Sequence, residues 1–284
     1  MSSEDYHKLP KFMQEKIKVP GIEEIKPSFF TRLTIPEEMK TLSIFSCRIL
    51  PDGNLIILDY RKRQLLLFSN DGIFIGIVVT FTQETYDVCF VRKRTVAVAL
   101  GASNQTKLVD TEKNKIIQTI KLSHNCYGVA SDGETLVISN NDRQSTRMNL
   151  NDMSHTILER MERLDCISLF QGNIYGTFPE ENKVCCYDST GEPLWTVQHQ
   201  DIDYPLGITL DINGFVYTAS SRNDSIVVIS PDGKSCKTIL SEADGIKEPI
   251  GIDINRETGI MIVSSKIMED RSYTDFETAF VYKI

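Results

Sequence analysis

The chain has 284 residues, of which 41% are hydrophobic and 25% charged, a composition typical of a globular protein with a sizeable core. Its formal net charge of −8 removes the simplest electrostatic argument for a nucleic-acid-binding protein. No apolar run approaches the roughly 18–20 residues of a membrane helix, and the N-terminal residues lack the apolar core of a signal peptide. We therefore expect a soluble, cytoplasmic protein that makes no membrane contact.

The first 24 residues show no repeated pattern, and we expect them to form an N-terminal extension ahead of one domain at residues 25–284. Residues 28–35 (SFFTRLTI) then combine aromatic and β-branched residues over a short length, which is typical of a β-strand. This predicted strand stands apart from the repeats that follow it.

Residues 50–72 (LPDGNLIILDYRKRQLLLFSNDG) supply the template of a repeat. Two Asp-Gly pairs bracket two apolar runs, and the basic triplet Arg61–Lys62–Arg63 lies between the runs. Because glycine readily adopts the positive φ that tight turns require, each Asp-Gly pair predicts a turn. The segment is therefore interpreted as the turns and middle strands of a four-stranded unit.

The template recurs five times along the chain, and the spacing is marked by the first apolar residue after each early turn: Leu55, Val96, Leu136, Ile174, Val216 and Ile260. The steps between these residues are 41, 40, 38, 42 and 44. A period near 40 residues with about four short strands per unit is the signature of a β-propeller. We therefore predict an all-β fold, a six-bladed β-propeller of four-stranded antiparallel blades.

The sixth repeat shows only three clear strands before the sequence ends. Because a propeller ring must close, the missing outer strand is expected to come from residues 28–35, paired with residues 278–284. Such pairing would join the two ends of the chain and cover the open edges of an unclosed sheet.

The repeats resemble a known family. Residues 204–234 (YPLGITLDINGFVYTASSRNDSIVVISPDGK) and 248–254 (EPIGIDI) share a Pro-x-Gly-Ile entry, and residues 47–72 carry the paired Asp-Gly turns. This pattern resembles the NHL repeat, and residues 25–284 are similar to the C-terminal propellers of tripartite-motif (TRIM-NHL-like) proteins. The resemblance implies a recognition module. Members typically carry a RING, B-boxes and a coiled coil upstream, whereas the first cysteine here, Cys47, lies inside the predicted propeller. Ubiquitin transfer by this chain itself is therefore not expected.

The seven cysteines are an odd number and include no C-x-x-C pair, which argues against a disulfide framework and a zinc ribbon. Four of them lie near predicted inner-strand starts: Cys47, Cys89, Cys126 and Cys166. A thiolate metal centre on the propeller axis is one interpretation. We favour the other, in which small, weakly polar side chains fill a crowded axis.

Some six-bladed propellers are calcium-dependent hydrolases that bind the metal with oxygen ligands from inner-strand starts. The equivalent positions here offer two carboxylates, Asp87 and Asp165, whereas calcium takes about six to eight oxygens. No nucleophile elbow or phosphate-binding loop occurs in the sequence. We expect no catalytic residue, metal, cofactor or small-molecule substrate, and a calcium-dependent hydrolase remains an alternative.

A second basic triplet, Arg92–Lys93–Arg94, lies in the turn between the first two strands of the second repeat. Because successive strands alternate in direction, the two triplets are expected on opposite faces of the ring, where they cannot form one patch. The loops expected beside Arg61–Arg63 carry mixed charge, whereas RNA binding needs an electropositive surface. An RNA-binding propeller is therefore the minority alternative to a protein-binding one.

The sequence thus predicts a non-catalytic interaction module that binds a protein or peptide partner through one propeller face. By resemblance, this would be target recognition for a TRIM-like ubiquitin ligase. We expect the contact to lie near an exposed aromatic patch at Tyr60, Phe178 and Tyr273. The residues predicted to bind the partner are Tyr60, Arg61, Lys62, Arg63, Arg143 and Arg222.

Overall fold

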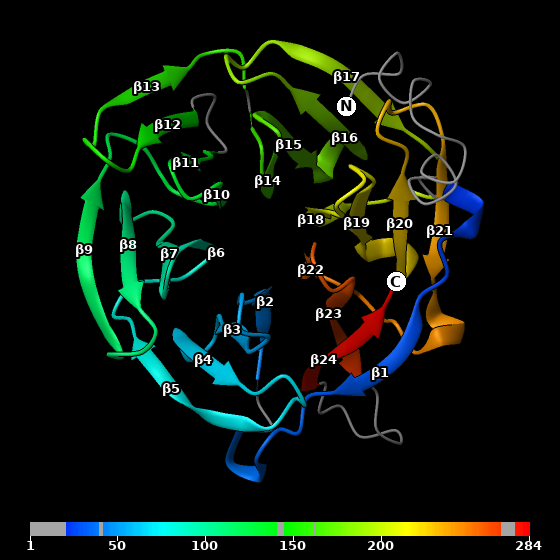
Figure 1. Ribbon diagram of the computed structural model, residues 1–284, viewed down its shortest axis with the longest axis horizontal. Helices are drawn as coiled ribbons and strands as arrows, with labels where there is room; N and C mark the ends of the chain where they lie inside the picture. The colour runs from blue at the N-terminus through cyan, green and yellow to red at the C-terminus, as the bar shows by residue number, and fades with distance from the viewer. Residues whose placement is uncertain (1–20, 40–41, 141–144, 162, 268–275) are drawn as a thin grey trace, which may run out of the picture.

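The computed structural model describes residues 21–39, 42–140, 145–161, 163–267 and 276–284. Its strands form six four-stranded sheets that are arranged as blades around a central axis (Figure 1). Every strand pairs antiparallel with its neighbours in the blade. The predicted fold, a six-bladed β-propeller, is confirmed.

The blades follow one another along the chain, each running from an inner strand at the axis to an outer strand. Blade 1 contains β2 (Ile44–Ile49), β3 (Leu55–Asp59), β4 (Gln64–Phe68) and β5 (Phe74–Thr80). Blade 2 contains β6 (Asp87–Arg92), β7 (Thr95–Ala99), β8 (Gln105–Asp110) and β9 (Lys115–Lys121). Blade 3 contains β10 (Val129–Ser131), β11 (Thr135–Ile138), β12 (Ser145–Asn149) and β13 (His155–Leu158).

The second half of the ring repeats this plan. Blade 4 contains β14 (Ile167–Phe170), β15 (Asn173–Phe178), β16 (Lys183–Tyr187) and β17 (Pro193–Gln198). Blade 5 contains β18 (Pro205–Leu210), β19 (Val216–Ser220), β20 (Ser225–Ile229) and β21 (Cys236–Leu240). Blade 6 contains β22 (Ile252–Asn255), β23 (Ile260–Ile267), β24 (Phe276–Lys283) and, as its outer strand, β1 (Ser28–Arg32).

The helices of the described residues are single 3-10 turns: η1 (Ile22–Glu24), η2 (Glu37–Met39), η3 (Pro179–Glu181), η4 (Ser221–Asn223) and η5 (Glu242–Asp244). In the part of the chain that is described, no helix has both the length and the apolar character needed to cross a membrane.

The ring is closed by the pairing of β1 with β24, in which Ser28 lies opposite Lys283 and Arg32 opposite Phe280. This confirms the predicted closure by an N-terminal strand. The strand is three residues shorter than residues 28–35, because Thr34 leaves blade 6 and donates its backbone N–H to the Gly72 carbonyl of blade 1 (2.8 Å). The predicted domain boundary after residue 24 stays a prediction, since residues 1–20 lie outside the described residues.

The hydrophobic core lies between the blades, with one buried cluster at each of the six junctions. Strand β3 shows the principle, since Leu55 and Ile57 pack toward blade 6 while Ile56 and Leu58 pack toward blade 2. Both faces of β3 are therefore buried, as are those of β20, which explains why these two strands are near-continuous apolar runs in the sequence.

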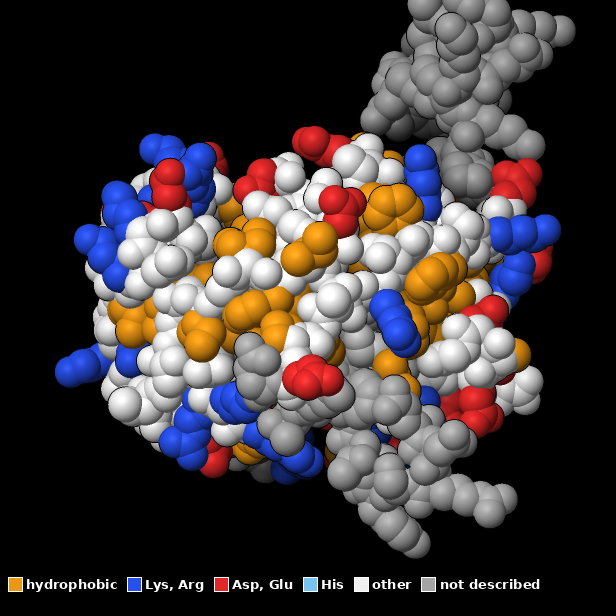
Figure 2. All heavy atoms as spheres, turned by 90° about the horizontal axis from the view of Figure 1, so that it is seen from below, with side chains coloured by type: hydrophobic (Ala, Val, Ile, Leu, Met, Phe, Trp, Pro, Cys, Tyr) orange, Lys and Arg blue, Asp and Glu red, His pale blue; other side chains and the backbone are white. Residues whose placement is uncertain are grey.

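The outer strands β1 and β5 expose apolar side chains on the side of the ring. Figure 2 views this side and shows hydrophobic atoms scattered between charged groups. The exposed large residues of this side are Phe29, Phe30, Ile73, Ile75 and Ile77. They lie on the perimeter and thus away from the loops at the central opening, where the candidate site is built.

The inner strands approach one another closely enough to require glycine at several positions. A Cβ atom on Gly207 would lie 2.4 Å from the backbone oxygen of Ile250 in the next blade, and one on Gly128 would lie 2.5 Å from the backbone oxygen of Asp165. Neither glycine has a positive φ, so the constraint is space and not backbone conformation. Neighbouring blades thus touch backbone to backbone at the axis.

We predict that Gly207→Ala lowers the free energy of unfolding by about 1–3 kcal/mol, because backbone atoms cannot move aside for the new methyl group. The matched control is Gly76→Ala in outer strand β5, where a Cβ meets no atom within 4 Å. That substitution should be neutral or slightly stabilising, since glycine weakens a strand. Urea unfolding of both variants tests the prediction, and equal effects of the two substitutions would contradict it.

Candidate functional site

The two faces of the ring carry different connections. The loop face carries the connections between the second and third strands of each blade, such as residues 60–63 and 221–224. The turn face carries those between the first and second strands, such as residues 93–94. Arg61–Arg63 therefore lies on the loop face and Arg92–Arg94 on the turn face, as predicted. On the turn face, Arg92 donates to Asn151 Oδ1 (2.9 Å) and Arg94 forms an ion pair with Glu112.

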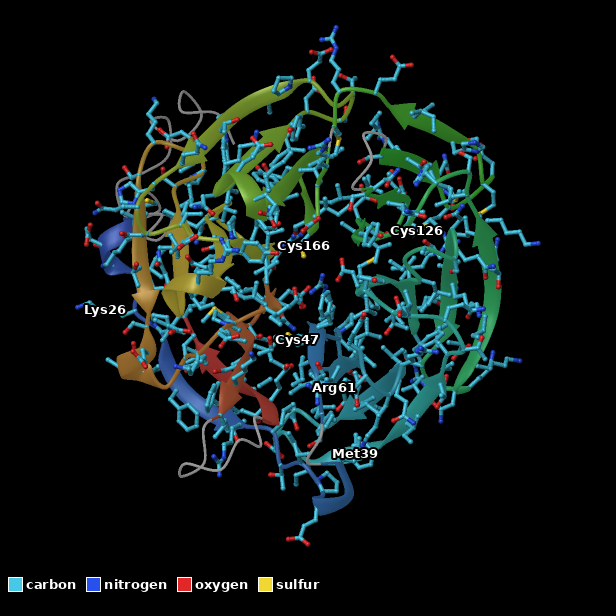
Figure 3. All side chains as sticks on the ribbon, turned by 180° about the vertical axis from the view of Figure 1, so that it is seen from behind. Lys26, Met39, Cys47, Arg61, Cys126 and Cys166 are labelled. Atoms are coloured by element: carbon cyan, nitrogen blue, oxygen red, sulfur yellow. The ribbon has the colours of Figure 1, made fainter. Side chains whose placement is uncertain are left out.

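The predicted binding residues of blade 1 surround the β3–β4 connection. Arg61 and Arg63 are exposed, and Arg63 donates from Nη1 to the Thr82 carbonyl (2.9 Å). The backbone N–H of Lys62 donates to Asp59 Oδ1 (3.2 Å), which fixes the turn. Figure 3 shows Arg61 on blade 1, outward from the central opening near which Cys47 and Cys166 lie.

The other two predicted binding residues lie on different blades. Arg222 on η4 is exposed and its guanidinium lies 4.2 Å from the ring centroid of Tyr204, with Asp203 at 4.0 Å. Arg143 lies outside the described residues, as does Tyr273. The structure thus places Tyr60–Arg63 and Arg222 on one face but on well-separated blades.

An aromatic cluster forms on the loop face from Phe45, Tyr60, Tyr86 and Tyr127, all of them partly exposed. The ring centroids of Phe45 and Tyr60 are 5.1 Å apart in a stacked arrangement, and those of Tyr86 and Tyr127 are 4.8 Å apart edge to face. Tyr86 also contacts Phe45 (5.8 Å) and Tyr60 (5.7 Å). Blades 1, 2 and 3 thus share one continuous aromatic surface.

Local backbone geometry holds this aromatic cluster in place. Phe45 lies at an irregularity in the pairing of β2 with β3, between Ile44 and Ser46. The ring of Tyr86 lies over Gly101, where a Cβ atom would come within 2.2 Å of ring atom Cε2. Gly101 has a positive φ of 48°, so both space and conformation favour glycine there.

The expected exposure of Phe178 is wrong. Phe178 ends β15 facing the junction with blade 3, where it is buried, and the ammonium of Lys183 lies 4.3 Å from its ring centroid. The aromatic surface of the loop face instead comes from Tyr86, Tyr127 and Phe45, which the sequence analysis did not single out. The sequence could have revealed them, because each directly precedes the inner-strand residue that lies closest to the next blade. These inner-strand residues, called the crowded positions below, are Ser46, Asp87 and Gly128 in blades 1 to 3.

The residue before that crowded position defines a ring around the central opening on the loop face. Gly128 approaches the backbone of Asp165 in the next blade, and Gly207 approaches that of Ile250. These contacts show which residues occupy the same place in neighbouring blades. From blade 1 to blade 6, these rim residues are Phe45, Tyr86, Tyr127, Asp165, Leu206 and Ile250. Three aromatic residues, two aliphatic residues and one acid thus line the opening.

Asp165 is the carboxylic acid among these rim residues. Burial, with the nearby Glu180 carboxylate adding to it, raises the pKa of Asp165 to about 6. Among the described residues, its carboxylate has no hydrogen-bond or ion-pair partner. Glu180 lies exposed on η3 of the same blade. The rim therefore presents an uncompensated carboxylate next to a second one.

Three described basic residues on the loop face of blades 4, 5 and 6 are paired with acids, whereas Arg163, two residues before Asp165, is exposed and does not contact its carboxylate. Lys183 contacts Glu181 (2.6 Å), Arg222 contacts Asp203, and Lys266 contacts Glu248. Asp165 therefore has no cation partner among the described residues. The loop face carries mixed charge, with exposed Arg61 and Arg63 on blade 1 and with Asp165 and Glu180 on blade 4, near the exposed Arg163.

The axis itself is braced by a buried ionic network that the sequence analysis missed. Arg48 donates from Nη2 to Asp87 Oδ1 (3.0 Å), and its side chain is 12% exposed. Asp87 also accepts from Ser46 Oγ (2.7 Å) in blade 1 and from the Val129 N–H (2.9 Å) in blade 3. One carboxylate thus bonds to both neighbouring blades.

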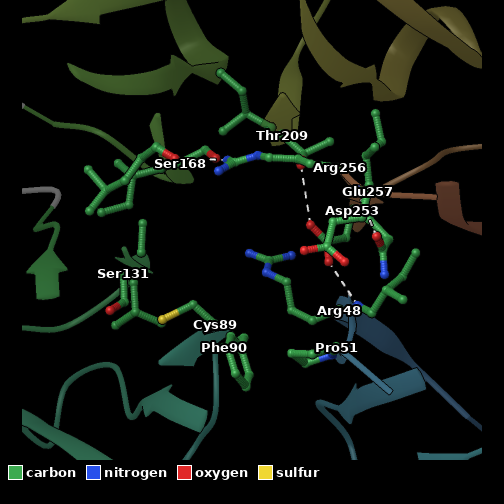
Figure 4. Close-up of a pocket in the computed structure, with 18 residues that line it drawn as sticks. Arg48, Pro51, Cys89, Phe90, Ser131, Ser168, Thr209, Asp253, Arg256 and Glu257 are labelled. Carbon is green, nitrogen blue, oxygen red and sulfur yellow. Dashed lines mark hydrogen bonds between the residues drawn. The ribbon is translucent and has the colours of Figure 1, made fainter. Parts of the chain in front are cut away.

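Asp253 acts in the same way on the other side of Arg48. It accepts from the Ile49 N–H (2.8 Å) in blade 1 and from Thr209 Oγ1 (3.2 Å) in blade 5 (Figure 4). Arg256 donates from Nη2 to the Leu169 carbonyl (2.8 Å) and from Nε to the Leu210 carbonyl (3.1 Å). These residues line a cavity of about 240 Å³ that opens on the turn face.

The two carboxylates expected at inner-strand starts therefore have different surroundings. Asp87 belongs to the axial network around Arg48, whereas Asp165 is a rim residue. Within the described ranges, no group of three or more His, Cys, Asp or Glu side chains is placed to hold a metal ion.

All seven cysteines are free thiols. Burial is the main cause that raises the pKa of Cys47 to about 12 and that of Cys126 to about 11. Cys185 and Cys186 pack into different blade junctions, as expected for neighbours on a strand. These thiols serve packing at the axis and between blades.

Comparison with known proteins gives a fold and no family. No protein-family model matches the sequence, and no curated protein matches it. Among solved structures, the chain is similar to a structural genomics protein of unknown function from Bacteroides thetaiotaomicron VPI-5482, with a TM-score of 0.68 and 14% identity. The match covers 86% of this chain and 70% of that one. At this identity, the likeness shows the fold alone.

We predict that Arg48→Met lowers the free energy of unfolding by about 3–5 kcal/mol, because it leaves the buried Asp87 carboxylate without its cation. The control is Arg94→Met, which breaks the exposed pair with Glu112 and should cost less than about 1 kcal/mol. Chemical denaturation of both variants measures the difference. Comparable losses in the two variants would show that the axial network does not brace the ring.

Because the folded-state pKa of Asp165 is raised, the native protein favours its protonated form, and the stability associated with that proton is lost as pH rises through about 6. Asp165→Asn should therefore match the parent protein near pH 4 and exceed its stability at pH 7.5, by on the order of 1–3 kcal/mol.

Asp188→Asn is the control for this pH dependence. Hydrogen bonds, first that from the Thr190 side chain, lower the pKa of Asp188, so its ionised form stabilises the fold at neutral pH. Its replacement should therefore destabilise the protein at pH 7.5. Thermal unfolding at several pH values measures both effects. A parent and an Asp165→Asn variant with the same pH profile would refute the role of Asp165.

Proposed function

We propose that this propeller is a non-catalytic interaction module that binds a protein partner through its loop face. The observation that carries the proposal is the partly exposed aromatic cluster of Phe45, Tyr60, Tyr86 and Tyr127, beside the exposed guanidinium groups of blade 1. Tyrosine and arginine are the residue types that most often dominate binding energy at protein interfaces.

The scaffold also suits a recognition role. The aromatic cluster is built from residues on three blades, which close-packed junctions and the axial network hold in fixed relation. A rigid surface loses little conformational entropy when a partner binds. By the resemblance of its repeats, the partner would be a target of a TRIM-like ubiquitin ligase in the cytoplasm.

A calcium-dependent hydrolase agrees less well with the axial chemistry. Oxygen atoms of Asp87 and Asp253 already accept hydrogen bonds from backbone N–H groups and side chains of adjacent blades. The guanidinium of Arg48 lies beside Asp87 and would repel a divalent cation. Calcium also needs about six to eight oxygen ligands.

An RNA-binding surface is the remaining alternative. The aromatic rings offer stacking platforms, and Arg61 and Arg63 lie next to them. The acids of blade 4 and the paired lysines of blades 4 and 6 interrupt any positive stripe around the loop face. We therefore favour a protein partner and treat RNA as an outcome of the test.

The two basic triplets supply a matched test on opposite faces. In the loop-face variant, Arg61, Lys62 and Arg63 are changed to Glu; in the turn-face variant, Arg92, Lys93 and Arg94 are changed to Glu. Each triplet contains one residue with a positive φ, Arg63 or Lys93, so the backbone strain is comparable. Proteins captured from nuclease-treated cytosol by the full chain and by each variant are quantified by mass spectrometry.

We expect the loop-face variant to lose specific partners and the turn-face variant to keep them. Tyr60→Ala should weaken the same partners by roughly 30-fold, the effect of a hot-spot residue of about 2 kcal/mol. Identical partner sets for both triplet variants would reject the loop face. Crosslinked RNA that disappears only from the loop-face variant, with protein partners unchanged, would favour the RNA alternative instead.

A further inference from the structure

We propose that the rim of the loop face accepts one cationic side chain of the partner, a lysine or an arginine, with Asp165 as its anionic contact. The inference rests on the proposed function, since it names the chemistry that the partner inserts at the central opening. The rim is mostly apolar, Asp165 has no partner among the described residues, and Lys183 and Arg222 on the loop face are paired with other acids.

The rim residues form an apolar wall with one acidic position. Phe45, Tyr86 and Tyr127 lie on three successive blades and contact one another in sequence. Leu206 and Ile250, both partly exposed, occupy the equivalent positions of blades 5 and 6. Such a wall matches the aliphatic stem of a long basic side chain, and aromatic faces attract its charged end.

Asp165 supplies the electrostatic preference. Its carboxylate is partly withdrawn from water and has no partner among the described residues, and Glu180 places a second negative charge near it. A desolvated carboxylate beside a like charge is unfavourable until a cation approaches. A bound ammonium or guanidinium group relieves this cost, whereas an anion or a carboxylate-bearing residue increases it.

No cation among the described residues contacts the Asp165 carboxylate, and Arg163, two residues before it, is exposed to solvent. Arg222 lies over the Tyr204 ring and beside Asp203, and Lys183 contacts Glu181. The uncompensated negative site therefore lies where the apolar rim meets blade 4. This complementarity favours a single cation on a flexible stem over a highly charged ligand.

The probes are Nα-acetyl-arginine amide and Nα-acetyl-lysine amide, and their neutral counterparts are the citrulline and norleucine amides. Binding to the full chain is measured by titration with NMR detection at pH 7.5. The rim variant is Asp165→Asn. The control is Glu257→Gln, which removes the same charge from an exposed position at the turn-face cavity.

We expect the cationic probes to bind more tightly than the neutral ones, and Asp165→Asn to weaken them at least about tenfold. Glu257→Gln should leave the affinity unchanged. Equal binding of citrulline and arginine amides, equal binding by the parent and Asp165→Asn, or no binding of a cationic probe to the parent would each overturn the inference.

This outcome is separable from that of the proposed function. Loss of partners on reversal of Arg61–Arg63, together with no cation preference at the rim, would leave the loop face as a docking surface and reject the role of Asp165. A cation preference lost in Asp165→Asn, with partners unaffected by reversal of the triplet, would establish the rim as a cation site and reject the proposed docking surface.

Discussion

The close approach of the six inner strands at the axis is the constraint on which the rest of the molecule depends. At this inner-strand position of blades 3, 5 and 6, the neighbouring blade leaves little room for a side chain, as Gly128, Gly207 and Gly251 show. In blade 2 the position is occupied by Asp87, whose carboxylate bonds to Ser46 of blade 1 and to Val129 of blade 3. Close backbone contact and hydrogen bonds between blades are thus two ways in which the inner strands pack at the axis.

The same constraint creates the candidate site. Neighbouring blades pack against each other near the start of each inner strand, and the inner strands begin on the loop face. The residue before this packed position therefore lies at the loop-face end of the axis. On three successive blades this residue is aromatic, and the rings contact around the rim at 5.8 Å and 4.8 Å. The residue before the packed position is thereby placed at the surface, where it is partly exposed on every blade. The proposed recognition chemistry is a consequence of how the propeller closes on its axis.

The blade count and ring closure could be predicted from the sequence because they depend on local features, namely turns at a regular spacing and apolar strands. The axial network could not. Arg48 donates to the Ile252 carbonyl, and Asp253 accepts from the Ile49 N–H. The two residues of each pair are 204 positions apart in the chain and meet only once the ring is closed. Phe178 was misplaced for a related reason, since the apolar character of a strand end does not tell which blade junction it faces. Aligning the residue before each crowded position would have revealed Phe45, Tyr86 and Tyr127.

The uneven distribution of charge on the loop face adds a directional element to the proposed binding. Arg61 and Arg63 are exposed at blade 1, the acids Asp165 and Glu180 lie at blade 4, and aromatic rings on blades 1 to 3 lie between the two groups. Arg163 is also exposed near Asp165, so the acids are not the only charges there. Electrostatic complementarity sets orientation and selects partners more than it adds affinity. A peptide that crosses this face with an acidic end over Arg61 and a basic side chain at Asp165 would be favoured, and its reversal would place like charges together at both ends. The aromatic surface would then supply affinity, and the charges would supply register.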